Sequence, residues 1–130
     1  QRDALFTIGQ QGLAELAHEV LKVYKADADS QVRGLAAWVL GRLRVQDALP
    51  DLLQGLQARH PEVRIWSAWA VGEMGFPNHV AALIAASERE QNPKVQRAIG
   101  GAIKKLRLEP VRAPRRVVAI PNTSRNIWNG

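Results

Sequence analysis

The chain repeats itself at an interval of 31 or 32 residues. Residues 32–41 align without gaps on residues 63–72, and a more divergent copy occupies residues 95–104. A truncated copy, residues 4–9, opens the chain 32 residues before its counterpart. A fixed interval of this size is the signature of a repeat architecture, in which each unit buries its apolar face against its neighbours. We therefore expect a stack of similar units rather than a fold closed around one centre.

Each repeat contains two helical segments. In the first segment Val32, Ala36, Val39, Leu40 and Leu43 fall on one face, and their counterparts 31 residues later do the same. The second segments show apolar residues at the same spacing of three and four: Leu13, Leu16, Val20, Leu21 and Val23, then Leu49, Leu52, Leu53 and Leu56, then Val80, Leu83 and Ile84. The spacing predicts an all-α, right-handed α-solenoid of about three and a half helical hairpins over residues 1–108.

The periodicity ends at Leu108. Pro110, Pro114 and Pro121 preclude a regular helix beyond it. The remaining segment is too apolar for a solvated tail, with Val117, Val118, Ile120, Ile127 and Trp128. We expect residues 109–130 to form an extended tail that packs on its own solenoid or on a partner subunit.

The net charge of +6 belongs to one end of the chain. Half of the 18 Lys and Arg residues lie after Gln91, where Glu109 is the single acid. The predicted basic patch comprises Lys94, Arg97, Lys104, Lys105, Arg107, Arg112, Arg115 and Arg116. Clustered basic groups bind phosphates by releasing counterions. A terminal repeat also needs a polar outer surface, so a nucleic-acid site and a capping surface or site for an acidic protein both remain open.

The pattern Val-Arg-x-x-Ala-Ala-x-x-Leu-Gly at residues 32–41, followed by Ala-Leu-Pro-x-Leu at residues 48–52, resembles HEAT-like repeats of the phycobilisome-lyase type. The resemblance extends over roughly residues 2–107 and implies an α-solenoid. Such repeats occur in scaffolds, bilin lyases, metal-dependent hydroxylases and appendages of larger enzymes, so the fold alone does not assign a function.

Residues 32–43 also resemble the C-terminal HEAT-like appendage of tRNA epoxyqueuosine reductases. The catalytic module of those enzymes contains many Cys, and this chain has none. That resemblance implies at most an accessory domain that contacts RNA. The chain begins inside a repeat, and we expect it to be part of a larger protein or complex.

The sequence predicts no catalytic residue, cofactor or metal site. Deoxyhypusine hydroxylases, which are HEAT-like, carry His-Glu iron ligands directly after the Val-Arg of several repeats. Here those positions hold Gly34-Leu35, Ile65-Trp66 and Arg97-Ala98, which cannot bind iron. A single His-Glu pair, His18-Glu19, lies elsewhere in its repeat. We therefore expect the chain not to be an enzyme.

Partner recognition is expected at the positions that vary between repeats and share one helix face. These candidate residues are Phe6, Leu35, Trp38, Arg42, Ile65, Trp66, Trp69 and Glu73. Phe6, Trp38 and Trp69 occupy equivalent positions and are expected to form a ladder across neighbouring helices. Tryptophan is a typical interface anchor, although the same rings are also expected of an ordinary core between hairpins.

The favoured function is a protein–protein interaction or scaffold module that binds a protein through this Trp-rich face. The alternatives are an RNA-binding accessory domain that uses the basic C-terminal end, and a bilin lyase or chaperone. The longest apolar runs are shorter than the roughly 18–20 residues that cross a bilayer. With no secretion signal and no Cys, we expect a cytoplasmic protein without membrane contact. The sequence leaves the oligomeric state open.

Overall fold

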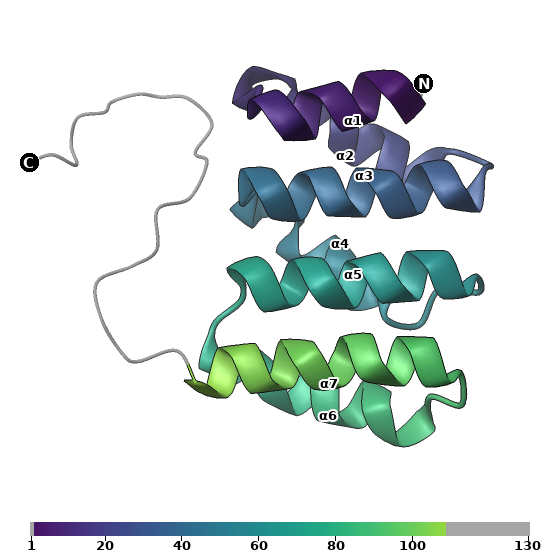
Figure 1. Cartoon of the computed structure of the whole chain (residues 1–130), viewed down its shortest axis with the longest axis vertical. Helices are drawn as coiled ribbons and strands as arrows, with labels where there is room; N and C mark the ends of the chain where they lie inside the picture. Colours follow the sequence, from purple (N-terminus) through teal and green to yellow (C-terminus); the bar gives the residue numbers. More distant parts are fainter. Residues whose placement is uncertain (1, 109–130) are drawn as a thin grey trace, which may run out of the picture.

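Residues 2–108 form seven α-helices and three short 3-10 helices in the computed structural model, which describes these residues (Figure 1). In chain order they are α1 (Arg2–Gln11), η1 (Ala14–Leu16), α2 (Ala17–Ala26), α3 (Ser30–Leu43), η2 (Gln46–Ala48), α4 (Leu49–Gly55), α5 (Pro61–Met74), η3 (Pro77–His79), α6 (Val80–Arg89) and α7 (Pro93–Leu108). The predicted tail, residues 109–130, lies outside the described residues.

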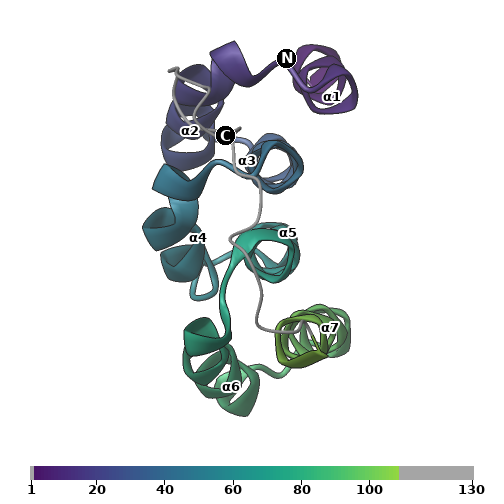
Figure 2. The ribbon, with the colours of Figure 1, turned by 90° about the vertical axis from the view of Figure 1, so that its left-hand side faces the viewer.

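The helices form two rows. Helices α1, α3, α5 and α7 make the first row, and α2, α4 and α6 make the second (Figure 2). The first row lies on the inner side of a shallow arc, and its helices all run in the same direction (Figures 1 and 2). The prediction of an all-α solenoid of stacked hairpins is confirmed, and no strand occurs among residues 2–108.

The core lies between the two rows. The five predicted core residues of α3, Val32, Ala36, Val39, Leu40 and Leu43, are all buried. Their counterparts on α5 are buried too, and they include Ser67, which is the buried polar residue of the described chain. Residue types that favour helix starts begin three of these helices: Asp29 caps α3 by accepting from the Gln31 N–H, and Pro61 and Pro93 are the first residues of α5 and α7.

The residue after the Val of each repeat ties its helix to the preceding second-row helix. In all three full repeats this side chain donates to a backbone carbonyl at or just beyond the end of that helix, where carbonyls lack helical partners. The bonds run from Arg33 Nε to Tyr24 O at 2.9 Å, from Arg64 Nη1 to Ala58 O at 2.9 Å, and from Gln96 Nε2 to Glu90 O at 2.7 Å. The Arg of the repeated Val-Arg pair is thus a structural residue.

Successive helices of the first row approach closely at glycines. A Cβ added at Gly41 of α3 would lie 3.0 Å from the Cα of Ala70 on α5. A Cβ at the equivalent Gly72 would lie 2.9 Å from the Cα of Ala102 on α7. Both contacts are to backbone, which cannot move aside as a flexible side chain would. The Gly that ends the blocks at residues 32–41 and 63–72 therefore sets the spacing between successive first-row helices.

Candidate functional site

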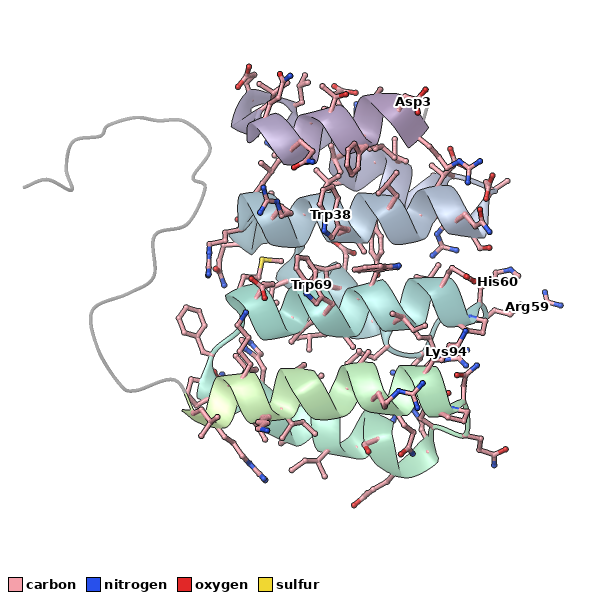
Figure 3. The ribbon with its side chains drawn as sticks, in the orientation of Figure 1. Asp3, Trp38, Arg59, His60, Trp69 and Lys94 are labelled. Carbon is pink, nitrogen blue, oxygen red and sulfur yellow. The ribbon has the colours of Figure 1, made fainter. Side chains whose placement is uncertain are left out.

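The candidate partner-binding residues lie on the first row of helices. We call them the ring face: Phe6, Leu35, Trp38, Arg42, Ile65, Trp66, Trp69 and Glu73. They come from α1, α3 and α5. Trp38 and Trp69 occupy corresponding places on two successive helices of the first row (Figure 3). The ring face thus lies on the inner side of the arc.

Phe6 and Trp38 form the first step of the expected ladder. Their ring centroids are 5.6 Å apart and their planes differ by 11°, so the rings are stacked. Phe6 is 49% exposed, whereas Trp38 is half-buried. Trp38 lies over Gly9 of α1, and a side chain at Gly9 would collide with its ring. The Trp38 indole thus packs against α1 at Gly9, whereas its stacking partner Phe6 is exposed to solvent.

The next step of the ladder differs from the expectation. Trp69 makes its ring contact with Trp66 of its own helix, edge to face, at 5.9 Å between centroids and 73° between planes. Trp69 is half-buried over Gly41, while Trp66 is 36% exposed and lies close to Gly34. The difference arises because Trp66 stands where the previous repeat has Leu35, which gives Trp69 an aromatic neighbour one helical turn away.

The sequence left open whether the aromatic rings belong to the core or to the surface, and the structure contains both kinds. Trp38 and Trp69 pack against the buried core, as do Leu35 and Ile65. Phe6 and Trp66 are exposed. Sequence reasoning did not include Gly9 and Gly41 in the site, although they seat the two half-buried rings. The signal that could have identified them is the recurrence of Gly three residues after Phe6, Trp38 and Trp69.

Charged groups border the rings toward the C-terminal ends of the helices. The guanidinium carbon of Arg42 lies 5.7 Å from the ring centroid of Trp38, a cation–π distance. Glu73 pairs with Lys105, which links α5 to α7. Arg44 donates to the Glu73 carbonyl at 2.7 Å. The ring face therefore has a cation at Arg42 and an acid at Glu73, which pairs with Lys105 on the neighbouring helix α7.

The members of the predicted basic patch that the structure describes lie toward the two ends of α7. Lys94 and Arg97 lie in its first turns, and Lys104, Lys105 and Arg107 lie near its end. At about 1.5 Å per residue the two ends are about 20 Å apart along the helix axis. The other predicted members, Arg112, Arg115 and Arg116, lie outside the described residues. The patch consequently follows the whole of α7 rather than one spot.

Tyr24, Ser67 and His79 have structural partners, whereas the buried Gln46 Oε1 has no hydrogen-bond partner in the described chain. The Tyr24 and Ser67 hydroxyl oxygens are 2.7 Å apart, and burial raises the pKa of Tyr24. Burial lowers the pKa of His79, whose Nδ1 accepts from the Phe76 N–H. Within residues 2–108, no group of three or more His, Asp or Glu side chains is arranged to hold a metal ion. These contacts connect helices and turns and offer no acid–base pair in an open site.

Two rows of helices, stacked at a fixed interval and presenting ordered rings on one side, define an α-helical repeat protein. The HEAT repeat family matches residues 16–107, and the chain belongs to this family. HEAT repeats commonly mediate protein–protein interaction or scaffolding. No curated protein matches the chain. Among the helices of residues 2–108, none has the length and apolar character needed to cross a membrane.

Proposed function

We propose that the chain is a noncatalytic interaction module that binds a protein partner through the ring face. The observation that carries the proposal is the pairing of an exposed ring with a half-buried one, Phe6 with Trp38 and Trp66 with Trp69. The buried member of each pair is seated on a glycine. The exposed member offers apolar area to a partner.

Such an arrangement favours binding because the rings are ordered before the partner arrives. Side chains that become immobilised on association each cost about 0.5–1.5 kcal/mol. Stacked and edge-on ring contacts already restrict Phe6 and Trp66 in the free protein. Aromatic residues in packed surroundings are also the residue types that carry most of the energy of protein interfaces.

Alanine substitution of the exposed rings tests the proposal. Phe6→Ala and Trp66→Ala remove exposed area while leaving the seated indoles in place, whereas Trp38→Ala and Trp69→Ala would also open the packing over glycine. The matched control is Phe76→Ala, because Phe76 is 37% exposed, directly precedes η3 and is not a member of the ring face. Proteins captured by the full chain would be identified, and the affinity of each measured with the purified variants.

The proposal expects a partner whose affinity falls about tenfold or more with Phe6→Ala or Trp66→Ala and stays unchanged with Phe76→Ala. Circular dichroism should report unchanged helix content for all three variants. Captured partners that bind all three variants as they bind the parent would overturn the proposal.

A second candidate is an RNA-contacting accessory domain, which α7 favours because it carries five Lys or Arg residues and no Asp or Glu. Its affinity for RNA should fall steeply between low and moderate salt, since phosphate contacts release counterions. Weak binding that does not depend on salt would exclude this function.

A further inference from the structure

The four first-row helices place equivalent residues in one column across the ring face. Three members are aromatic, and the fourth, on the last helix, is a glycine: Phe6, Trp38, Trp69 and Gly101. We call this set the ring column. Trp38 covers Gly9 of the helix before it, and Trp69 covers Gly41 in the same way. By the same register, a side chain at residue 101 would extend over Gly72 of α5 toward Trp69.

The position at Gly101 is open. Gly101 is exposed, and a Cβ added to it would meet no heavy atom within 4 Å. The rings at the two preceding positions are both half-buried against neighbours. Trp69 is therefore the last ring of the column, and the place beside it, which would receive a ring if the repeat continued its pattern, is empty of side chain.

Positive charge surrounds this position. Arg97 and Lys104 lie four residues before and three residues after Gly101, on the same side of α7, and both are exposed. Lys105 lies one helical turn after Gly101 and is paired with Glu73. Helix α7 contains no Asp or Glu. By the repeat register, an occupant of this position would be the next member of the ring column after Trp69, and two exposed cations would lie near it along the helix.

We infer that an acidic segment of the protein partner inserts an aromatic side chain beside Trp69 at Gly101 and places its carboxylates against Arg97 and Lys104. The inference rests on the proposed function and specifies the chemistry of the partner. The guest ring completes the ring column and gains the edge-on or stacked contacts that such rings prefer. The positive charges of Arg97 and Lys104 favour segments that carry carboxylates over neutral or basic segments.

The distribution of charge favours a peptide over a nucleic acid. A nucleic-acid strand that followed the ring column from α7 onto α5 would meet the carboxylate of Glu73. Residues 1–93, which include the other first-row helices, hold eleven acidic side chains against nine basic ones. The positive charge is thus confined to the C-terminal part of the chain, which suits a short acidic peptide. Single-stranded nucleic acids are bound along extended basic grooves. The basic segment 109–130 of this chain has the wrong charge for Arg97 and Lys104.

Peptides selected on the full chain provide the test. A random dodecapeptide library is panned on the immobilised protein, and enriched peptides are titrated by fluorescence anisotropy against four variants. Gly101→Trp fills the position from within, and Gly101→Ala is its matched control, since both replace a helical glycine but the alanine adds no ring. Arg97→Glu with Lys104→Glu reverses the charge, and Trp128→Ala removes the Trp of the tail.

The inference expects enriched peptides that carry an aromatic residue flanked by Asp or Glu. Their affinity should fall about tenfold or more with Gly101→Trp and with the charge reversal, and less than about threefold with Gly101→Ala. Backbone amide shifts of Gly101 and the indole N–H shift of Trp69 should move on titration.

Other outcomes overturn the inference in distinguishable ways. Peptides that require Phe6 and Trp66 but tolerate Gly101→Trp would leave the proposed function standing and remove the site at Gly101. Oligouridine that competes at Gly101 more strongly than any selected peptide would assign the position to nucleic acid. A gain in peptide affinity with Trp128→Ala would assign it to the tail of this chain. A library without enrichment would overturn the inference, while the proposed function is tested separately by the affinities of captured proteins for Phe6→Ala and Trp66→Ala.

Discussion

The hydroxyl groups of Tyr24 and Ser67 lie 2.7 Å apart although 43 residues separate them in the chain. The contact joins α2 to α5 across the buried interior, and the Tyr24 hydroxyl also lies 3.3 Å from the Asp51 carbonyl oxygen, for which it is a donor. Gly55 of α4 leaves the room for it, because a Cβ there would collide with both hydroxyl groups. One polar contact thus ties together three hairpins, and it depends on a glycine.

Gly55→Ala should destabilise the fold. The added methyl group would displace the buried Tyr24 side chain or separate α4 from α5, and overpacking of this kind costs about 1–3 kcal/mol. Urea unfolding followed by circular dichroism measures the free energy of unfolding. The matched control is Gly100→Ala, whose Cβ would meet nothing within 4 Å and which should gain about 0.5–1 kcal/mol from the higher helix propensity of alanine. A stability equal to that of the parent for Gly55→Ala would show that the core can adapt around Tyr24.

Tyr24→Phe and Ser67→Ala should each reduce stability, and their effects should not add. Tyr24→Phe deprives the Ser67 hydroxyl of this buried partner, which costs about 1–3 kcal/mol. Ser67→Ala should cost less, because the Tyr24 hydroxyl still donates to the Asp51 carbonyl. The double variant removes both hydroxyls, so a double-mutant cycle should report a coupling of about 0.5–3 kcal/mol. Independent, additive effects would mean that each hydroxyl is satisfied elsewhere.

The ion pair between Arg64 and Glu90 predicts a loss of stability in acid. Burial by itself raises the pKa of Glu90, but the hydrogen bonds from Arg64 and from the Asn92 N–H outweigh it and hold the pKa below the ordinary 4.5. A carboxyl with a lowered pKa in the folded state stabilises the fold above its unfolded pKa, and this contribution is lost as pH falls through the folded pKa. The parent should therefore be more stable than Glu90→Gln at pH 7.

The difference between the parent and Glu90→Gln should then narrow as pH falls below 4.5, the ordinary pKa of the group. Chemical unfolding of both proteins at a series of pH values measures it. A difference that is constant with pH would indicate that the carboxylate charge contributes nothing to the contact.

Gln96→Leu should weaken the last hairpin, and Gln96→Arg should not. Gln96 donates to the carbonyls of Ser87 and Glu90 at 2.9 and 2.7 Å. Losing these bonds at an exposed site costs about 0.5–1.5 kcal/mol. Arginine occupies the equivalent position in the two preceding repeats and donates to equivalent carbonyls, so Gln96→Arg should retain most of the stability. Amide hydrogen exchange in α6 and α7 locates the effect, and equal exchange in both variants would contradict the proposed tie.

The repeat interval predicted the fold because every hairpin buries equivalent residues against its neighbours. The buried set on α3 and its counterpart on α5 follow from spacing alone, since residues three and four apart share a helix face. The starts of α3, α5 and α7 follow from local residue types, an Asp at the N-cap of α3 and a Pro at the first position of α5 and of α7. What spacing could not give is the direction of a side chain at a shared position. Trp69 turns to Trp66, whereas Trp38 turns to Phe6, because the residue one turn away differs between repeats.

The candidate site was predicted less completely than the fold. The sequence located the rings but could not tell which were exposed, because exposure depends on the neighbouring helix and not on the helix that carries the ring. Gly41 shows this: it accommodates the Trp69 ring at 2.7 Å from an added Cβ, a contact between residues of different repeats. The Val-Arg pair was visible as a motif, but its role required the carbonyls that Arg33 and Arg64 reach.

The common direction of the first-row helices gives the inner face an electrical polarity. Each helix carries a partial positive charge at its N-terminus and a partial negative charge at its C-terminus, and in parallel helices these add instead of cancelling. One edge of the face, where Asp3, His60 and Lys94 lie (Figure 3), gathers the positive ends. The opposite edge gathers the negative ends, which Arg44, Lys105 and Arg107 offset. A charged group of a ligand that reaches one of these edges would therefore meet partial charges of opposite sign at the two ends of the helices, which favours one orientation over the other.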